Sequence, residues 1–178
     1  MKNWFFFLFF SLAATPLFSQ SDAPGAHPDM VKLFTEFGTE MDRPKIIGSY
    51  AMLQRLNIRI NPELAYTYLW QKNQFMKPEE TNCHPVGYYI DRENNLAVFF
   101  FYSGNADNLF YTLSMQVYNI KSAKLTDELA TVGGFAPSSS SCSLHFSSMQ
   151  NITVRTVSGL EDNTVSMQIT KSGKIKAL

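Results

Sequence analysis

The two cysteines of this chain each lie close to a histidine, a combination that can bind a metal or carry out nucleophilic chemistry. Cys83 directly precedes His84 in "TNCHPVGYY", and Cys142 lies three residues before His145 in "SCSLHF". Zinc binds thiolates and imidazoles in a tetrahedron, so these four side chains could form a Cys₂His₂ site. A thiol activated by a neighbouring histidine would instead be a nucleophile. The third hypothesis is a disulfide.

The spacing of these residues favours the disulfide. Neighbours in an extended strand point to opposite faces, so Cys83 and His84 are poorly placed to bind one ion. No third residue that would orient a catalytic histidine is identifiable. Two cysteines in an oxidising compartment normally pair. We therefore predict a Cys83–Cys142 bond, worth about 4 kcal/mol on the chain-entropy view, and we expect neither a metal nor another cofactor.

The N-terminus indicates that the protein is exported into such a compartment. Lys2 is followed by an apolar run from residue 4 to residue 12, then by Pro16 and a small, polar stretch. This is the layout of a secretory signal peptide. The run is shorter than the roughly 20 apolar residues that a membrane-spanning helix needs. We predict a signal peptide at residues 1–20, with an uncleaved N-terminal anchor as the alternative.

The rest of the chain, residues 21–178, is expected to form one domain without stable membrane insertion, located in the periplasm, at the cell surface or outside the cell. The full chain has 15 basic and 15 acidic residues, and loss of Lys2 leaves 14 basic residues against 15 acidic ones. A balanced charge gives no support for nucleic acid as a partner.

The first part of this domain, residues 28–72, predicts three short helices. A "PD" pair starts the first, and apolar residues then recur at helical spacing. These residues are Met30, Leu33, Phe34, Phe37 and Met41. A second helix is expected over residues 45–56. The third should begin at Asn61, a favourable N-cap, and run to Trp70.

The second part, residues 83–178, predicts antiparallel strands. Residues 109–118 alternate as in a strand with one buried face. Thr112, Ser114 and Gln116 share one face, and the buried face is formed by Leu109, Tyr111, Leu113, Met115 and Val117. Residues 164–170 repeat the pattern with Val165, Met167 and Ile169 inward. Residues 96–102, "LAVFFFY", are apolar on both faces, which indicates a central strand covered on both sides. We therefore predict an α+β fold, with three helices packed on an antiparallel meander of about eight strands.

Two stretches of the strand-rich part share a succession of short motifs. "SGNADN", "SMQ" and "KSAK" begin at Ser103, Ser114 and Lys121, and "SGLEDN", "SMQ" and "KSGK" begin at Ser158, Ser166 and Lys171. This favours two related units, residues 83–129 and 142–178, arranged as two packed sheets or as one long meander. The alternative is that hairpin turns select Gly, Asn, Ser and Lys regardless of ancestry.

Aromatic residues gather in the predicted strands. They are Tyr88, Tyr89, Phe99, Phe100, Phe101, Tyr102, Phe110, Tyr111 and Tyr118. Aromatic residues in strands mostly pack in the core or across strands. The functional alternative is an exposed aromatic face for a sugar, peptide or protein.

No set of acid, base and nucleophile stands out, and neither a phosphate-binding glycine loop nor a serine-hydrolase motif occurs. We therefore expect a binding protein or a cell-envelope interaction protein, with a protein or a glycan as partner and its binding residues unassigned. The alternative is a secreted hydrolase of glycans or peptides. It would use carboxylates in turns, namely Asp91, Glu93, Asp107 and Asp162.

Four stretches carry a resemblance to known proteins. They are the Phe-rich start ending in "FSQ", the "INPELAYTYL" helix, the "YYIDRENNLAVFFF" hairpin and the closing "KSGKIKAL". Together they resemble a diffuse group of small secreted bacterial β-rich proteins of unassigned function. The resemblance implies export and a β-rich domain, and it implies no catalytic residue.

Overall fold

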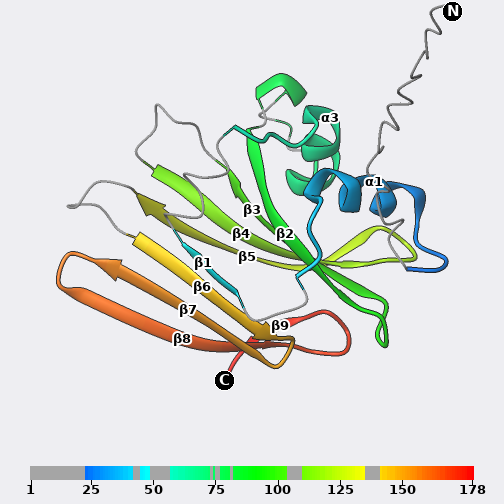
Figure 1. The fold of residues 1–178 in the computed structure, drawn as a ribbon. Helices are drawn as coiled ribbons and strands as arrows, with labels where there is room; N and C mark the ends of the chain where they lie inside the picture. The colour runs from blue at the N-terminus through cyan, green and yellow to red at the C-terminus, as the bar shows by residue number, and fades with distance from the viewer. Residues whose placement is uncertain are drawn as a thin grey trace, which may run out of the picture.

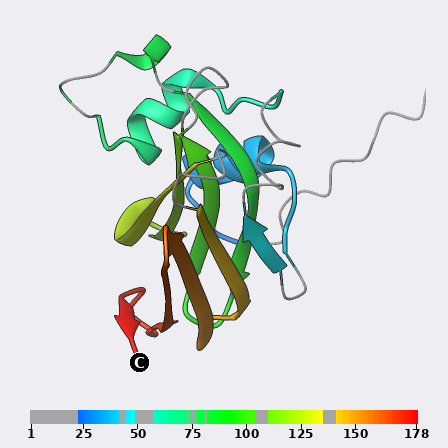
Figure 2. The ribbon, with the colours of Figure 1, turned by 90° about the vertical axis from the view of Figure 1, so that its left-hand side faces the viewer.

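The computed structural model describes residues 23–41, 45–48, 57–72, 74, 77–80, 82–103, 110–134 and 141–178. The predicted signal peptide lies outside these residues. A layer of helices, a four-stranded sheet and a five-stranded sheet are stacked in that order (Figures 1 and 2). The helices are α1 (Pro28–Phe37), α3 (Pro62–Leu64), the π-helical turn η1 (Ala65–Leu69) and the 3₁₀ turn η2 (Pro78–Glu80). The strands are β1 (Lys45–Gly48), β2 (Cys83–Asp91), β3 (Leu96–Ser103), β4 (Phe110–Asn119), β5 (Lys124–Gly134), β6 (Ser141–Ser148), β7 (Asn151–Ser158), β8 (Glu161–Ile169) and β9 (Ile175–Ala177).

The two sheets are antiparallel and confirm the α+β class in outline. The first has the strand order β2–β3–β4–β5, and the second has the order β1–β6–β7–β8–β9. The prediction of one meander is therefore wrong in detail, since the described strands divide between two sheets. Each predicted unit forms a four-strand meander of its own, and β1 joins the second by pairing with β6. Ser103 and Ser158 both lie at the end of the second strand of a unit. A common ancestry of the units stays a prediction.

The sheets pack face to face around a first hydrophobic core. The first sheet contributes Val86, Leu96, Val98, Phe100, Tyr102, Leu113, Met115 and Val117, and the second contributes Ile47, Cys142, Leu144, Phe146, Ile152, Val154 and Ile169. The Tyr102 hydroxyl donates a hydrogen bond to the carbonyl oxygen of Gly48 at 2.6 Å, which ties β3 to the short strand β1 across this core.

A second hydrophobic core lies on the opposite face of the first sheet, beneath the helices. It contains Cys83, Tyr88, Ile90, Ala97, Phe99, Phe101, Tyr118 and Ile120 from the sheet region, and Met30, Leu33, Phe34, Phe37, Ile60, Ala65 and Leu69 from the helical part. Every residue of β3 is buried, because its side chains alternate between the two cores. The prediction that this strand is covered on both sides is confirmed.

Helix α1 forms as predicted but ends earlier. The His27 side chain caps its N-terminus by accepting a hydrogen bond from the Asp29 amide. Gly38 then adopts a left-handed conformation, with φ of 68°, and its amide donates to the carbonyl of Phe34. This is the usual glycine termination of a helix. Met41 consequently lies outside the helix, where its amide donates to the carbonyl of Tyr88 at the edge of β2.

The predicted helix over residues 45–56 is wrong where the structure describes it. Residues 45–48 form β1, and residues 49–56 lie outside the described part. Two consecutive β-branched residues, Ile46 and Ile47, favour a strand. Pairing with β6 places Ile47 in the core between the sheets, where it is completely buried.

The predicted third helix is present as α3 continued by η1. Its N-cap is Asn61, whose side chain accepts from the amides of Glu63 and Leu64. The Tyr68 hydroxyl donates to the Asp29 carboxylate of α1. Burial, followed by this hydrogen bond, raises the pKa of Tyr68 to about 12. This hydrogen bond connects α1 to η1, and it thereby helps to position Trp70, which follows η1. In the part of the chain that is described, no helix has the length and apolarity to cross a bilayer.

Strand β8 follows its predicted pattern only at its end. Ile169 is buried and Met167 packs against the core, but Val165 is 41% exposed. Residues 161–166 are all exposed, so the first part of this strand has no buried face. The alternation of apolar and polar residues therefore did not show where along β8 the hydrophobic core ends.

Candidate functional site

The two cysteines and two histidines considered as zinc ligands point to different parts of the molecule. Cys83 belongs to the core beneath the helices, and Cys142 belongs to the core between the sheets. His145 is exposed on β6, with Nε2 3.3 Å from the Ser147 hydroxyl. His84 is buried, with Nδ1 2.9 Å from the carbonyl oxygen of Ile58. Alternation along β2 and β6 therefore separates the side chains that a Cys₂His₂ site would bring together.

The predicted disulfide is not formed in the structure either. Both cysteines are buried thiols. A disulfide needs Cα atoms about 4.4–6.8 Å apart, whereas packed sheets lie about 10 Å apart. The Cys83 side chain also points away from the sheet that carries Cys142, since it lies beneath the helices. Burial raises the pKa of Cys83 to about 12, even though the Trp70 indole donates a hydrogen bond to its sulfur.

The carboxylates considered for hydrolysis are divided between the two sheets in the described part of the chain. Asp91 accepts hydrogen bonds from Asn94 in the turn after β2, and Glu93 lies exposed in the same turn. Asp162 lies on the other sheet, where it forms an ion pair with Arg155. Asp107 lies outside the described residues.

Most of the aromatic residues belong to the two cores. Phe100 and Tyr102 lie between the sheets, and Tyr88, Phe99 and Tyr118 lie beneath the helices. The side chains of Phe110 and Tyr111 lie outside the described part. The packing interpretation is therefore confirmed for the buried members. Phe101 differs from them, because it also lines a pocket.

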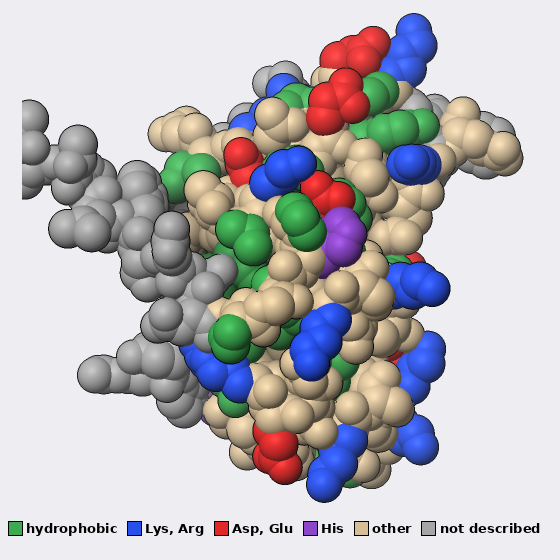
Figure 3. Space-filling model, turned by 90° about the vertical axis from the view of Figure 1, so that its right-hand side faces the viewer, with side chains coloured by type: hydrophobic (Ala, Val, Ile, Leu, Met, Phe, Trp, Pro, Cys, Tyr) green, Lys and Arg blue, Asp and Glu red, His purple; other side chains and the backbone are tan. Residues whose placement is uncertain are grey.

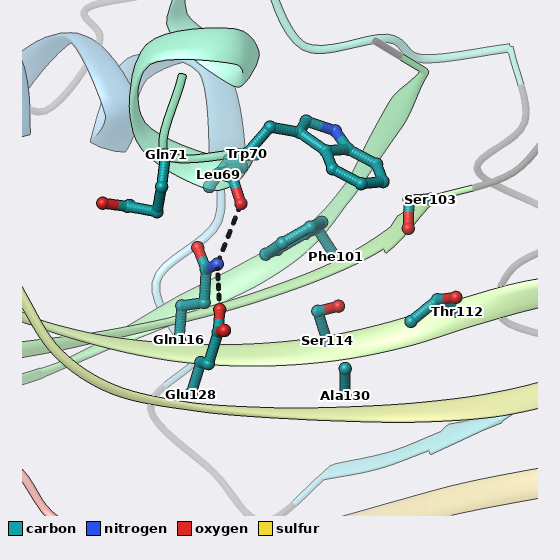
Figure 4. A pocket seen from close by; sticks show the side chains of 10 residues that line it. All are labelled: Leu69, Trp70, Gln71, Phe101, Ser103, Thr112, Ser114, Gln116, Glu128 and Ala130. Carbon is teal, nitrogen blue, oxygen red and sulfur yellow. Dashed lines mark hydrogen bonds between the residues drawn. The ribbon is translucent and has the colours of Figure 1, made fainter. Parts of the chain in front are cut away.

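This pocket lies on the helix-facing side of β3, β4 and β5 (Figure 4). Its volume is about 320 Å³. The lining residues are Leu69, Trp70 and Gln71 from the end of η1, Phe101 and Ser103 from β3, Thr112, Ser114 and Gln116 from β4, and Glu128 and Ala130 from β5. The Trp70 ring lies over Phe101, while Gln116 and Glu128 stand together to one side.

The pocket exists because the sheet presents small side chains beside large ones. Ser103, Ser114 and Ala130 lie on the same face of the sheet as Phe101, and Trp70 reaches this face from the end of η1. Ser114 and Gln116 were predicted to share the face opposite the core. They do share a face, but η1 covers part of it, so they are only 7% and 2% exposed.

Gln116 is the most constrained polar side chain of the pocket. Its Nε2 donates to the carbonyl oxygen of Leu69 and to Glu128 Oε2, both at 2.9 Å (Figure 4). Its Oε1 lies 3.0 Å from the Tyr118 hydroxyl. Both neighbours of the nitrogen are acceptors, which fixes the orientation of the amide. Gln116 therefore positions Glu128 relative to η1 and has no N–H left for a ligand.

The Tyr118 hydroxyl closes this network beneath the pocket. It lies 2.7 Å from the carbonyl oxygen of Tyr68 and accepts from Gln71 Nε2 at 3.2 Å. Burial raises the pKa of Tyr118, and the negative charge of Glu128 is the next cause. The phenol therefore stays neutral, and the negative charge of Glu128 acts on groups within the pocket.

The serine hydroxyls of the pocket are available to a ligand. Ser103 and Ser114 are 8% and 7% exposed, and neither hydroxyl has a hydrogen-bond partner among the residues that the structure describes. Neither hydroxyl oxygen is sealed in the core, since His84 Nε2 is the only fully buried side-chain polar atom without a partner among the described residues. Both hydroxyls can therefore form hydrogen bonds with water or with a ligand in the pocket.

Only one feature of this site could be predicted from the sequence. The alternation of residues 112–117 placed Ser114 and Gln116 on one face. Trp70, at the end of the predicted third helix, and Glu128, on β5, carried no motif. Only the packing of η1 against the sheet brings these two residues to one pocket.

Comparisons with protein families, with curated proteins and with solved structures find no match to this chain. On the face shown in Figure 3, charge does not mark a site among the described residues. The face shown in Figure 3 mixes basic, acidic and apolar side chains, and among the described residues on it no single kind forms a continuous patch. The pocket over β3–β5 is therefore the feature on which we base a function.

Proposed function

We propose that this protein is an exported binding protein whose pocket holds one sugar unit of a glycan. The observation that carries the proposal is the combination of the Trp70–Phe101 pair with the Ser103 and Ser114 hydroxyls. Sugar rings have apolar faces that pack on aromatic rings and hydroxyls at their edges. An aromatic wall beside hydrogen-bonding groups matches both features.

The size of the pocket agrees with a small ligand. Binding pockets in proteins typically span about 300–1,000 Å³, and this one lies at the lower end of that range. It suits one ring rather than a long oligosaccharide. The rest of a glycan chain would extend into solvent, as expected for a protein that binds the end of a polymer.

The charges of the pocket favour binding over the rival glycan hydrolase. Glycoside hydrolysis usually requires two carboxylates about 5–10 Å apart. Glu128 is the single carboxylate among the described lining residues, and Asp91, Glu93 and Asp162 are not among them.

Fluorescence of Trp70 tests the proposal. The chain has two tryptophans, Trp4 and Trp70, so removal of the signal peptide leaves Trp70 as the only one. We expect saturable changes in its emission when monosaccharides are added. Ser114→Leu should reduce the affinity at least about tenfold, or 1.4 kcal/mol, because the larger side chain fills the pocket while Trp70 is retained.

Ser166→Leu is the matched control. Ser166 occupies the same place in the second "SMQ" stretch, but it is exposed on β8, away from the pocket. It should leave binding unchanged. If no saccharide altered the emission, or if both variants weakened binding equally, the pocket would not be the binding site.

Export and the state of the thiols can be tested by one mass measurement. Protein recovered from the periplasm or medium should have lost residues 1–20. Alkylation of this protein in denaturant without reductant should add two alkyl groups, because burial and a pKa of about 12 protect Cys83 from oxidation. No alkylation would show that the cysteines are joined, and an intact N-terminus would contradict cleavage.

A further inference from the structure

Among the described residues that line the pocket, Glu128 is the only charged one. Its side chain accepts a hydrogen bond from Gln116 at 2.9 Å, and it forms no ion pair with another described residue. The carboxylate therefore brings a negative charge into the pocket that the described part of the protein does not balance.

Gln116, which is hydrogen-bonded to Glu128, carries no charge and cannot neutralise the carboxylate. Gln116 has used both of its N–H groups, one on Glu128 and one on Leu69. The groups that remain at this end of the pocket are hydrogen-bond acceptors, namely the second carboxylate oxygen of Glu128 and the carbonyl oxygen of Leu69. A ligand group that lies here must therefore donate hydrogen bonds.

A cationic donor fits this end better than a neutral one. A hydrogen bond between charged groups is stronger than one between a carboxylate and a hydroxyl. The aromatic rings of Trp70 and Phe101 also attract positive charge through their faces. An acidic sugar would instead be repelled by Glu128, so the electrostatics select among glycans.

We infer that the sugar unit held in this pocket carries a protonated amine, which Glu128 binds. The inference rests on the function proposed above. It names the ligand class as unacetylated amino sugars, and it assigns Gln116 the role of a positioning residue that orients the carboxylate.

The test compares glucosamine, N-acetylglucosamine and glucose by titration of Trp70 fluorescence. The second and third probes lack the charge. Glu128 is exposed, so water competes for it, and we expect glucosamine to bind about three- to tenfold more tightly than the others. Glu128→Gln should remove this difference, because it keeps the shape and the acceptor for Gln116 but loses the charge.

Glu93→Gln is the matched control, since it removes the same charge from an exposed turn away from the pocket, and it should preserve the preference. Equal affinities of the three sugars for the unaltered protein would overturn the inference and leave sugar binding intact. A preference that survives in Glu128→Gln would assign the amine to another residue and would also overturn it. Binding of none of the sugars would refute the proposed function itself, and the inference with it.

Discussion

Replacement of Phe99 by alanine is expected to lower the free energy of unfolding by about 3–5 kcal/mol, the range for large aromatic residues in a core. Phe99 is fully buried beneath the helices. Its ring centroid lies 4.7 Å from that of Phe37, 5.4 Å from that of Phe34 and 5.7 Å from that of Tyr118. The substitution leaves a cavity between α1 and the first sheet, and urea unfolding followed by circular dichroism measures the loss.

Phe100→Ala provides the comparison for Phe99→Ala. Phe100 is the next residue of β3, and it is fully buried on the other side, in the core between the sheets. Both substitutions should cost similar amounts if β3 separates two real cores. A loss below about 1 kcal/mol at Phe99, as typical of surface positions, would contradict the packing of the helices on this sheet.

Gly173→Ala is expected to destabilise the protein by about 2–4 kcal/mol, because two costs combine. Gly173 has φ of 79°, a conformation that residues with a side chain rarely adopt. A methyl group on its Cα would lie 2.9 Å from Thr126 Cβ and 3.2 Å from Leu96 Cδ2. The turn is held firmly, since the amide of Ile175 donates to Asp127 of β5 at 2.9 Å.

Gly159→Ala separates the backbone cost from the packing cost. Gly159 has a similar φ of 61°, but no atom lies within 4 Å of where its methyl group would be placed. It should cost only about 1–2 kcal/mol, the price of the left-handed conformation alone. Equal losses in thermal or urea unfolding would show that the turn before β9 does not pack closely on β5.

The sequence predicted those parts of the fold that depend on local pattern. The apolar character of both faces of "LAVFFFY" anticipated that β3 lies between two cores, and the Asn61–Pro62 start anticipated α3. Prediction from the sequence failed where strand pairing in the folded protein overrides local conformational preference. Residues 45–48 form a strand that pairs with β6 and buries Ile47, and helix α1 ends at Phe37, before Met41, the last residue of its predicted apolar face.

The candidate site was less predictable than the fold, for a physical reason. Its residues come from η1, β3, β4 and β5, which are distant in the sequence, and no spacing rule connects Trp70 to Glu128. The cysteines show the reverse case. They share a simple pattern in the sequence, yet the alternation of β2 and β6 buries them in different cores. Composition and spacing could not show which face of each strand its neighbours would cover.

The most direct test of sugar binding in this pocket is a ¹H–¹⁵N correlation spectrum of residues 21–178, which contain Trp70 but not Trp4, during titration with glucosamine. Its single indole signal belongs to Trp70. We expect this signal to shift together with the backbone amides of the lining residues Thr112, Ser114, Gln116, Glu128 and Ala130. Amides of the exposed residues 158–166 in the β7–β8 hairpin should stay fixed. Shifts confined to that hairpin, or a spectrum unchanged at saturating sugar, would contradict the proposed binding site.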